Sequence, residues 1–437
     1  MRSTHPSLTE QLQQALNLHQ QGQFANAKEL YQAILLAQPE HFDALHLLGV
    51  LEAQTGYFDN AVRLMRAAIG LKNDHYGVYY NCGNALKENL QPQAAIECYS
   101  HAIALNPHYA EAYSSRGLVH SDLRQYSAAL ADFDKASALS PDFADVYVNR
   151  GNVLQELRDW QGALACYNLA ISKKPDFALA YYNRGNALHK LSQLEAALNS
   201  YSMASKINPR YTYAFFNQGV ILVKLQRLSE ALTCYSQALA IKADYLEAYC
   251  GRALVWQTLN QEQNALQDYA QALTINPDYV EAYNNRATLY ANSGHLEQAR
   301  HDYERTLTLQ PEHKEALSNY GNLMKDLRHL KVALASLEKA VQIDTEWADA
   351  HWNYALALLL NGDLARGWQE QEWRWRCPGF PSEKRNFTPP LWLGKTAIAG
   401  KTLLLHTEQG MGDSLQFCRY VPLLKPLGAK LILEAER

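Results

Sequence analysis

The stretch ALAYYNRGNALHKLSQLEAALNSYSMASKINPRY, residues 178–211, contains the pattern that decides the fold. Its small residue Gly185 has a small counterpart every 34 residues along most of the chain, and these counterparts are Gly49, Gly83, Gly117, Gly151, Gly219, Ala253, Ala287, Gly321 and Ala355. Ala197 and the bulky Tyr201 recur with the same period, and Pro209 recurs less regularly. A fixed period of this length is typical of stacked helix pairs, in which each pair packs only on its neighbours.

The order of the recurring residues resembles the tetratricopeptide repeat family, whose repeat places an aromatic, a small residue, an alanine, an aromatic, an alanine and a proline in succession. In residues 178–211 these are Tyr181, Gly185, Ala197, Tyr201, Ala204 and Pro209. The resemblance implies an all-α fold, a right-handed superhelix (α-solenoid) of helix pairs. We expect ten repeats over residues 8–347 and an atypical eleventh repeat with capping helices over residues 348–376.

Charge and composition narrow the class of function. Charged residues make up 19% of the chain and the formal net charge is -4, so neither a nucleic-acid surface nor a membrane-binding face is favoured. The N-terminus lacks the apolar run of a secretory signal, and the cysteines show no metal-ligand spacing. We therefore expect a cytoplasmic protein with no metal and no cofactor, whose partners are proteins or peptides.

A column of asparagines is the strongest candidate for a binding site. By resemblance to known arrays, the first helix of each pair lines the concave surface, and its sixth position holds Asn81, Asn149, Asn183, Asn217, Asn285, Asn319 and Asn353. An asparagine side chain offers both a donor and an acceptor to the backbone of an extended peptide. The column resembles the asparagine ladder of O-GlcNAc transferase. The alternative is that these residues only tolerate a solvated helix face or bond to neighbouring turns.

Aromatic residues gather near the middle of this column. Tyr182, Tyr213 and Phe216 lie close in sequence to Asn183 and Asn217, and Asn186 follows in the same repeat. Aromatic side chains often anchor partners at interfaces, so this patch is the expected anchor for a peptide. The alternative interpretation is that some of the rings pack between helices.

Arginine occupies the seventh position of five repeats, at Arg116, Arg150, Arg184, Arg252 and Arg286. An acidic residue lies five places earlier in most of these repeats, so we favour charge pairing between stacked repeats over a phosphate-binding stripe. No lysine occupies the fifth position of a repeat, which disfavours the carboxylate clamp of chaperone-binding members of the family.

The periodicity fades after Trp347, and residues 377–400 form a Pro/Trp connector. An apolar run at residues 401–406, a glycine turn at 408–413, a helix over about 414–421 and a second run at 430–434 predict one strand–helix–strand crossover. Residues 401–437 are therefore expected to form a small, incomplete α/β segment.

The string from Leu403 to Leu424 resembles the opening of bacterial glycosyltransferases that follow a tetratricopeptide array, related to heptosyltransferases and O-GlcNAc transferase. The resemblance implies a sugar or acceptor loop and a general base at Asp413, the loop comprising Glu408, Gln409, Gly410 and Gly412. Asp413 is equally well placed to cap a helix N-terminus. Members of this kind bind the nucleotide sugar in a further domain, so we expect residues 401–437 to be a truncated part of such an enzyme, inactive alone.

Two functions follow from the sequence. The first is a scaffold that binds extended peptide or protein partners in its concave groove and carries a truncated glycosyltransferase-like C-terminus. The second is the substrate-recognition part of a glycosyltransferase, with a nucleotide sugar as ligand only if the missing domain is supplied.

Overall fold

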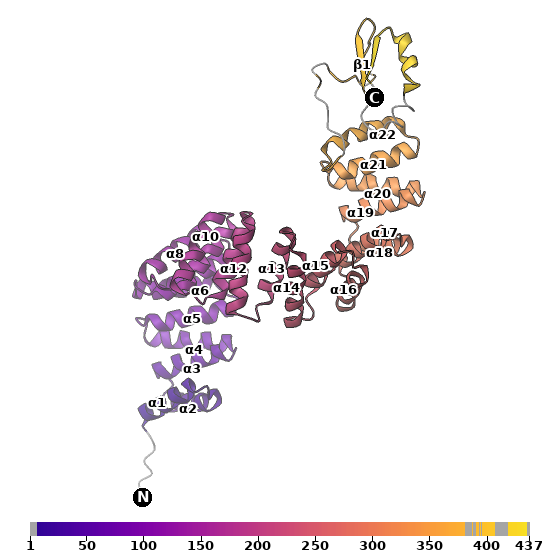
Figure 1. The fold of residues 1–437 in the computed structure, drawn as a ribbon. Coiled ribbons are helices and arrows are strands. Elements are labelled where there is room, and N and C mark those ends of the chain that lie inside the picture. Colours follow the sequence, from indigo (N-terminus) through magenta and orange to yellow (C-terminus); the bar gives the residue numbers. More distant parts are fainter. Residues whose placement is uncertain are drawn as a thin grey trace. The chain divides into compact units, whose positions relative to one another are not determined.

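A computed structural model of the chain describes residues 7–380, 387, 390–392, 394, 396–406 and 418–434 (Figure 1). The chain divides into two compact units, residues 1–261 and 262–437. The boundary falls between the two helices of the eighth pair, at a place that the sequence pattern does not mark.

The first unit is an array of antiparallel helix pairs. The first helices of its pairs are α1 (Leu8–Gln20), α3 (Phe42–Gln54), α5 (Tyr76–Glu88), α7 (Ala110–Asp122), α9 (Ala144–Glu156), α11 (Ala178–Lys190), α13 (Thr212–Lys224) and α15 (Leu246–Thr258). The second helices are α2 (Phe24–Ala37), α4 (Phe58–Leu71), α6 (Pro92–Leu105), α8 (Tyr126–Leu139), α10 (Trp160–Lys173), α12 (Leu194–Ile207) and α14 (Leu228–Ile241). The all-α repeat array expected from the 34-residue period is confirmed.

The turn inside each helix pair is set by a residue with positive φ. Such a residue recurs every 34 positions, at Gly22, Gly56, Leu90, Arg124, Arg158, Ser192, Gln226, Asn260, Gly294, Arg328 and Gly362. In the sixth pair, Ser192 has φ 59°, and the next amide, that of Gln193, donates to the carbonyl of Leu188 at 2.9 Å. This bond closes the end of α11 in the manner of a left-handed helix cap. Most pairs therefore carry a side chain where glycine is usually preferred.

The core of the array lies between the two helices of each pair. The ring that recurs with the 34-residue period is fully buried in most pairs, at Tyr31, Tyr99, Phe133, Tyr167, Tyr201, Tyr269 and Tyr303. A Cβ atom on Gly185 would lie 2.5 Å from Cε1 of Tyr201. The small residue is therefore required because the ring of the second helix fills the space beside the first helix.

A branched side chain at Gly185 tests this packing. We expect Gly185→Val to destabilise the array by about 1–3 kcal/mol, because the new methyl groups overlap the Tyr201 ring. The urea midpoint of the helical circular-dichroism signal measures the loss. Gly70→Val in α4 is the matched control, since no atom lies within 4 Å of its Cβ position. Equal shifts for the two variants would contradict the packing argument.

The second unit also consists mainly of stacked helices. They are α16 (Glu262–Ile275), α17 (Val280–Asn292), α18 (Leu296–Leu309), α19 (Lys314–Asp326), α20 (Leu330–Ile343), α21 (Ala348–Leu360), α22 (Leu364–Gln371) and the 3-10 helix η1 (Glu372–Arg376). The helix α22 has only 8 residues, so the eleventh pair is atypical, as its sequence predicts.

A buried histidine joins the eleventh pair to the segment that follows. His351 Nδ1 lies 2.5 Å from Glu370 Oε2, and His351 Nε2 lies 3.0 Å from the carbonyl oxygen of Thr345. The Trp373 ring stacks on the imidazole, with centroids 4.0 Å apart and planes 7° apart. Trp373 thus packs against the end of the array through its aromatic ring.

The C-terminal segment of the second unit contains a small parallel sheet. Strand β1 (Thr402–His406) pairs with β2 (Lys430–Glu434) in a register that joins Thr402 to Lys430 and His406 to Glu434. Both predicted strands are thus present. Of the helix expected over residues 414–421, residues 414–417 lie outside the described part. The 3-10 helix η2 (Val421–Leu427) begins where that helix was expected to end, and Pro426 within it is incompatible with a continued α-helix.

Candidate functional site

The asparagines of the first unit form a linked set across adjacent first helices. Asn183 Nδ2 donates to Asn152 Oδ1 at 2.9 Å, and Asn217 Nδ2 donates to Asn186 Oδ1 at 3.3 Å. Asn217 Nδ2 also lies 3.2 Å from the Tyr182 hydroxyl. We call the side of α9, α11 and α13 that carries Asn152, Asn183, Asn186 and Asn217 the asparagine face.

Buried tyrosines of the second helices orient the asparagine face by hydrogen bonds from the core. The hydroxyls of Tyr167 and Tyr201 donate to Asn152 Oδ1 and Asn186 Oδ1, each at 2.8 Å. Burial raises the pKa of Tyr201 well above its usual value, so the hydroxyl keeps the proton that it donates. Core packing and the orientation of the face are therefore coupled through Tyr167 and Tyr201 in these two repeats.

This arrangement uses the amide nitrogens of Asn183 and Asn217 and leaves their oxygens available. Among the described residues, no side chain or amide donates to either Oδ1 atom. Both side chains are half-buried. Each therefore presents a fixed hydrogen-bond acceptor, which is the partner that a backbone N–H requires.

The other asparagines of the column differ from this pair. Asn81 Nδ2 lies 2.9 Å from His46 Nε2, whereas Asn149 lies in α9, three residues before Asn152. Three members belong to the second unit, at Asn285, Asn319 and Asn353. Of these, Asn285 accepts from Asn284 at 3.4 Å and Asn353 donates to Ser318 Oγ at 3.2 Å. Asn81 and Asn353 therefore share with Asn217 a bond to the fifth position of the preceding repeat. Asn183 and Asn217 in addition bond to asparagines of the preceding first helix.

The aromatic patch separates into packing residues and one exposed ring. Tyr182 packs on Tyr211 with centroids 5.0 Å apart, and Phe216 packs on Tyr245 at the same distance. Tyr213 is 50% exposed, with its edge toward Tyr245. Tyr182 and Phe216 therefore serve to pack neighbouring helices together. Tyr213 is the ring of this patch that a partner can contact.

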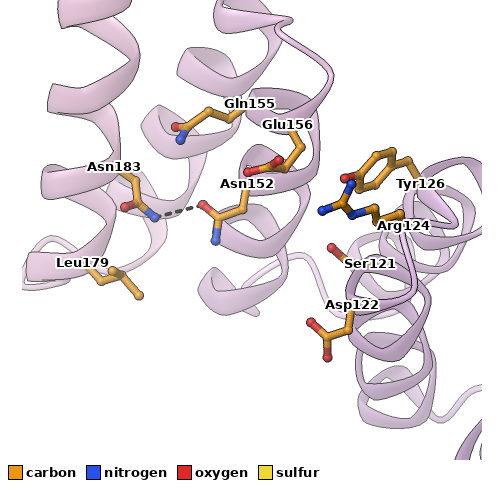
Figure 2. A pocket seen from close by; sticks show the side chains of 9 residues that line it. All are labelled: Ser121, Asp122, Arg124, Tyr126, Asn152, Gln155, Glu156, Leu179 and Asn183. Atoms are coloured by element: carbon orange, nitrogen blue, oxygen red, sulfur yellow. Dashed lines mark hydrogen bonds between the residues drawn. The ribbon is translucent and has the colours of Figure 1, made fainter. Parts of the chain in front are cut away.

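A hollow of about 510 Å³ opens beside the asparagine face (Figure 2). Its lining residues come from α7, the turn after it, the start of α8, α9 and α11, and they are Ser121, Asp122, Arg124, Tyr126, Asn152, Gln155, Glu156, Leu179 and Asn183. Figure 2 shows Asn183 bonded to Asn152, with Gln155 and Glu156 one turn further along α9. Sequence reasoning found only Asn183 of these residues. The signal it missed is the acidic thirteenth position of α7 and α9, at Asp122 and Glu156.

A second hollow, of about 540 Å³, lies at the start of the first unit. Leu16, Phe24, Leu47 and Val50 contribute most of its apolar lining. Here Leu47 occupies the position that holds asparagine in later repeats. The character of the first-helix face therefore changes from apolar to amide-rich along the unit.

The arginines of the seventh position differ in their partners. Arg150 pairs with Asp134 of the preceding repeat at 2.8 Å, as expected for charge pairing between stacked repeats, whereas Arg184 donates to the neutral Ser200 and Asn168. Arg116 forms two bonds to Asp132, at 2.9 and 2.7 Å, and Arg286 bonds to Asp302 at 2.6 and 2.9 Å. The hydrogen bond to Asp132 raises the pKa of Arg116. Asp132 and Asp302 lie 16 residues after their arginines, on the second helix of the same pair, and not five residues earlier. Bidentate pairing inside a repeat leaves the guanidinium groups of Arg116 and Arg286 unsuited to a phosphate-binding stripe.

The predicted C-terminal site lies outside the described residues. This applies to Asp413 and to the loop residues Glu408, Gln409, Gly410 and Gly412. Over the described ranges, no group of three or more histidine, cysteine or acidic side chains is arranged to hold a metal ion. No helix in the same ranges has both the length and the apolar character needed to cross a membrane.

Sequence models of the tetratricopeptide repeat family match most of the array. They match residues 12–75, 110–143, 178–211, 246–279 and 269–301 as tetratricopeptide repeats, and residues 93–123, 159–192 and 219–260 as TPR repeats. The chain belongs to the tetratricopeptide repeat family. None of these matches reaches residues 401–437.

Solved structures of other repeat proteins show likeness over parts of the chain. The structure of MamA is 26% identical, covers 37% of this chain and 94% of its own, and has a TM-score of 0.36. YrrB, described as a TPR protein with an unusual peptide-binding site, is 26% identical over 43% of this chain and 96% of its own, with a TM-score of 0.39. Yeast Tom70 is 13% identical over 84% of this chain and 91% of its own, with a TM-score of 0.43. A comparison with curated proteins found no match.

Proposed function

We propose that the protein is a scaffold whose first unit binds extended segments of partner proteins on its asparagine face. The observation that carries this proposal is the pair of carboxamides at Asn183 and Asn217, whose nitrogens are held by the preceding repeat. Their oxygens are thereby oriented before a ligand arrives, which reduces the entropy lost on binding.

The geometry suits a peptide backbone more than a particular side chain. Adjacent helices lie about 8–10 Å apart, which is roughly three residues of an extended chain at about 3.3 Å each. Acceptors repeated at this spacing can take backbone N–H groups at intervals, independently of the peptide sequence. Tyr213, half exposed at the edge of the face, adds an apolar contact that favours some sequences over others.

Removal of the two acceptors tests the proposal. We expect Asn183→Ala with Asn217→Ala to weaken binding of a library-selected, fluorescein-labelled peptide by roughly tenfold to thirtyfold, because each lost hydrogen bond contributes about 1 kcal/mol. Fluorescence anisotropy measures the change. The same variant loses some stability as well, since both side chains also bond to the preceding repeat.

The matched control replaces Asn199 and Gln237 by alanine. Both carry exposed carboxamides on second helices, α12 and α14. Peptide affinity should stay within about twofold of the wild type in this control. Equal weakening in the two double variants would refute binding at the asparagine face.

For the C-terminal segment, the parallel pairing of β1 and β2 supports a second candidate. Parallel strands require a crossover connection, as in the first unit of an α/β domain. We propose that residues 401–437 are the beginning of a glycosyltransferase-like domain, with the roles of Asp413 and the 408–412 loop resting on the resemblance alone. Saturable binding of a nucleotide sugar in a calorimetric titration supports this candidate. If no nucleotide sugar binds at millimolar concentrations, peptide binding by the scaffold remains the only supported function of this chain.

A further inference from the structure

The charges along the first-helix face of the first unit change sign between the fifth and sixth repeats. At the thirteenth position, α7 and α9 end in Asp122 and Glu156, whereas α11 and α13 end in Lys190 and Lys224. The two carboxylates line the hollow beside the asparagine face. The two lysines occupy the same position on the next first helices, so all four side chains lie along one edge of the face.

No charged partner among the described residues neutralises these four side chains. Asp122, Glu156 and Lys190 form no ion pair with any described residue, and Lys224 contacts only the neutral acceptor His189 Nε2, at 2.7 Å. Some charged residues elsewhere on the array are paired, such as Lys87 with Glu88 at 3.0 Å and Arg116 with Asp132. The four charged side chains at the thirteenth position therefore remain able to pair with a ligand.

The residues around each charged pair reinforce the sign of its charge. The hollow is lined by two carboxylates and by the single guanidinium of Arg124, so its net charge is negative. At the other end, burial lowers the pKa of His189, and the nearby charges of Lys224 and Lys190 lower it further. The imidazole is therefore held neutral by a field that favours anions.

We propose that this face takes an extended peptide of divided charge, with basic side chains over Asp122 and Glu156 and acidic side chains over Lys190 and Lys224. This inference rests on the proposed function and names the class of partner. The centres of the two charged pairs lie two first helices apart, about 20 Å at the usual helix spacing, which corresponds to about six residues of extended chain. Charge complementarity of this kind selects the partner and its direction along the face.

The probe is the capped peptide Lys-Lys-Ser-Thr-Ser-Thr-Glu-Glu with its reversed sequence, both labelled with a neutral fluorophore. The comparison peptides carry lysine at all four charged positions, glutamate at all four, or glutamine at all four. In low salt, we expect one of the two divided-charge peptides to bind the full chain about tenfold more tightly than any comparison peptide. Added salt should reduce this advantage, because exposed charges are screened.

Reversing the charge of the two lysines tests whether these residues select the peptide. With Lys190→Glu and Lys224→Glu, the peptide with four lysines should become the tightest ligand. The control Lys135→Glu with Lys206→Glu makes the same change in net charge on exposed residues of the second helices α8 and α12, and should leave the ranking unchanged.

Two outcomes overturn the inference: equal affinities for all five peptides, or the same change of ranking in the control. If the glutamine peptide binds as well as the others and remains sensitive to Asn183→Ala with Asn217→Ala, the charge inference fails while the proposed function stands. If no peptide binds, both fail.

Discussion

Replacing Tyr201 by alanine is expected to lower the free energy of unfolding of the sixth repeat by about 3–5 kcal/mol. The Tyr201 side chain is fully buried on α12 and belongs to a cluster with Leu188 of α11 and Ile221 of α13. Its loss leaves a cavity that touches two repeats. Because each repeat contacts only its neighbours, the loss should be local to α11, α12 and α13. Hydrogen exchange of the amides in these helices measures it.

Tyr201→Phe is the matched control for this experiment. It keeps the ring and removes only the hydroxyl that donates to Asn186, so the expected loss is about 1 kcal/mol. Peptide affinity should nevertheless fall, because Asn186 then loses one of the two donors that hold it and Asn217 is less well oriented. A phenylalanine variant as unstable as the alanine variant would show that the hydroxyl, and not ring packing, dominates.

Acid is expected to destabilise the second and third repeats by an amount on the order of 3 kcal/mol between about pH 6.5 and 4. Burial, and then the neighbouring His75, lower the pKa of His46 to about 4, while Asp43 opposes the shift. In the unfolded chain the imidazole becomes protonated near its ordinary pKa of about 6.5. Between these values the unfolded chain binds more protons than the folded chain, so stability falls as the pH falls. At higher pH this group contributes no pH dependence.

The His46→Gln variant isolates this effect. The carboxamide that this variant introduces can still accept a hydrogen bond at the place where Asn81 lies 2.9 Å from the imidazole, but it does not titrate. Amide exchange in α3, α4 and α5 should then vary less with pH than in the wild type. His108→Gln, at an exposed residue after α6, should leave the pH dependence unchanged. An unaltered acid response in His46→Gln would place the titrating group elsewhere.

The repeat architecture could be predicted because each packing position recurs many times. Gly185 and Tyr201 sit at fixed places in the 34-residue unit, and their contact follows from the helical periodicity alone. The turn between the helices could not be predicted from residue type, because Leu90, Arg124 and Ser192 adopt the conformation that Gly22 adopts in the first pair. The surrounding helices impose it.

The candidate site was only partly predictable. The asparagine column is visible in the sequence, but the bonds that orient Asn183 and Asn217 depend on side chains of the preceding repeat. The packing of Phe216 could not be predicted from the sequence, because its contact Tyr245 lies 29 residues away. Asp122 and Glu156 resemble ordinary solvated helix ends until the hollow that they line is seen.

The most direct test of the account is a crystal structure of the full chain with the tightest peptide selected from a random library. We expect an extended peptide across α9, α11 and α13, with backbone N–H groups within hydrogen-bond distance of Asn183 Oδ1 and Asn217 Oδ1. A peptide bound on the second helices, or one that is helical and leaves both oxygens without a contact, would contradict it.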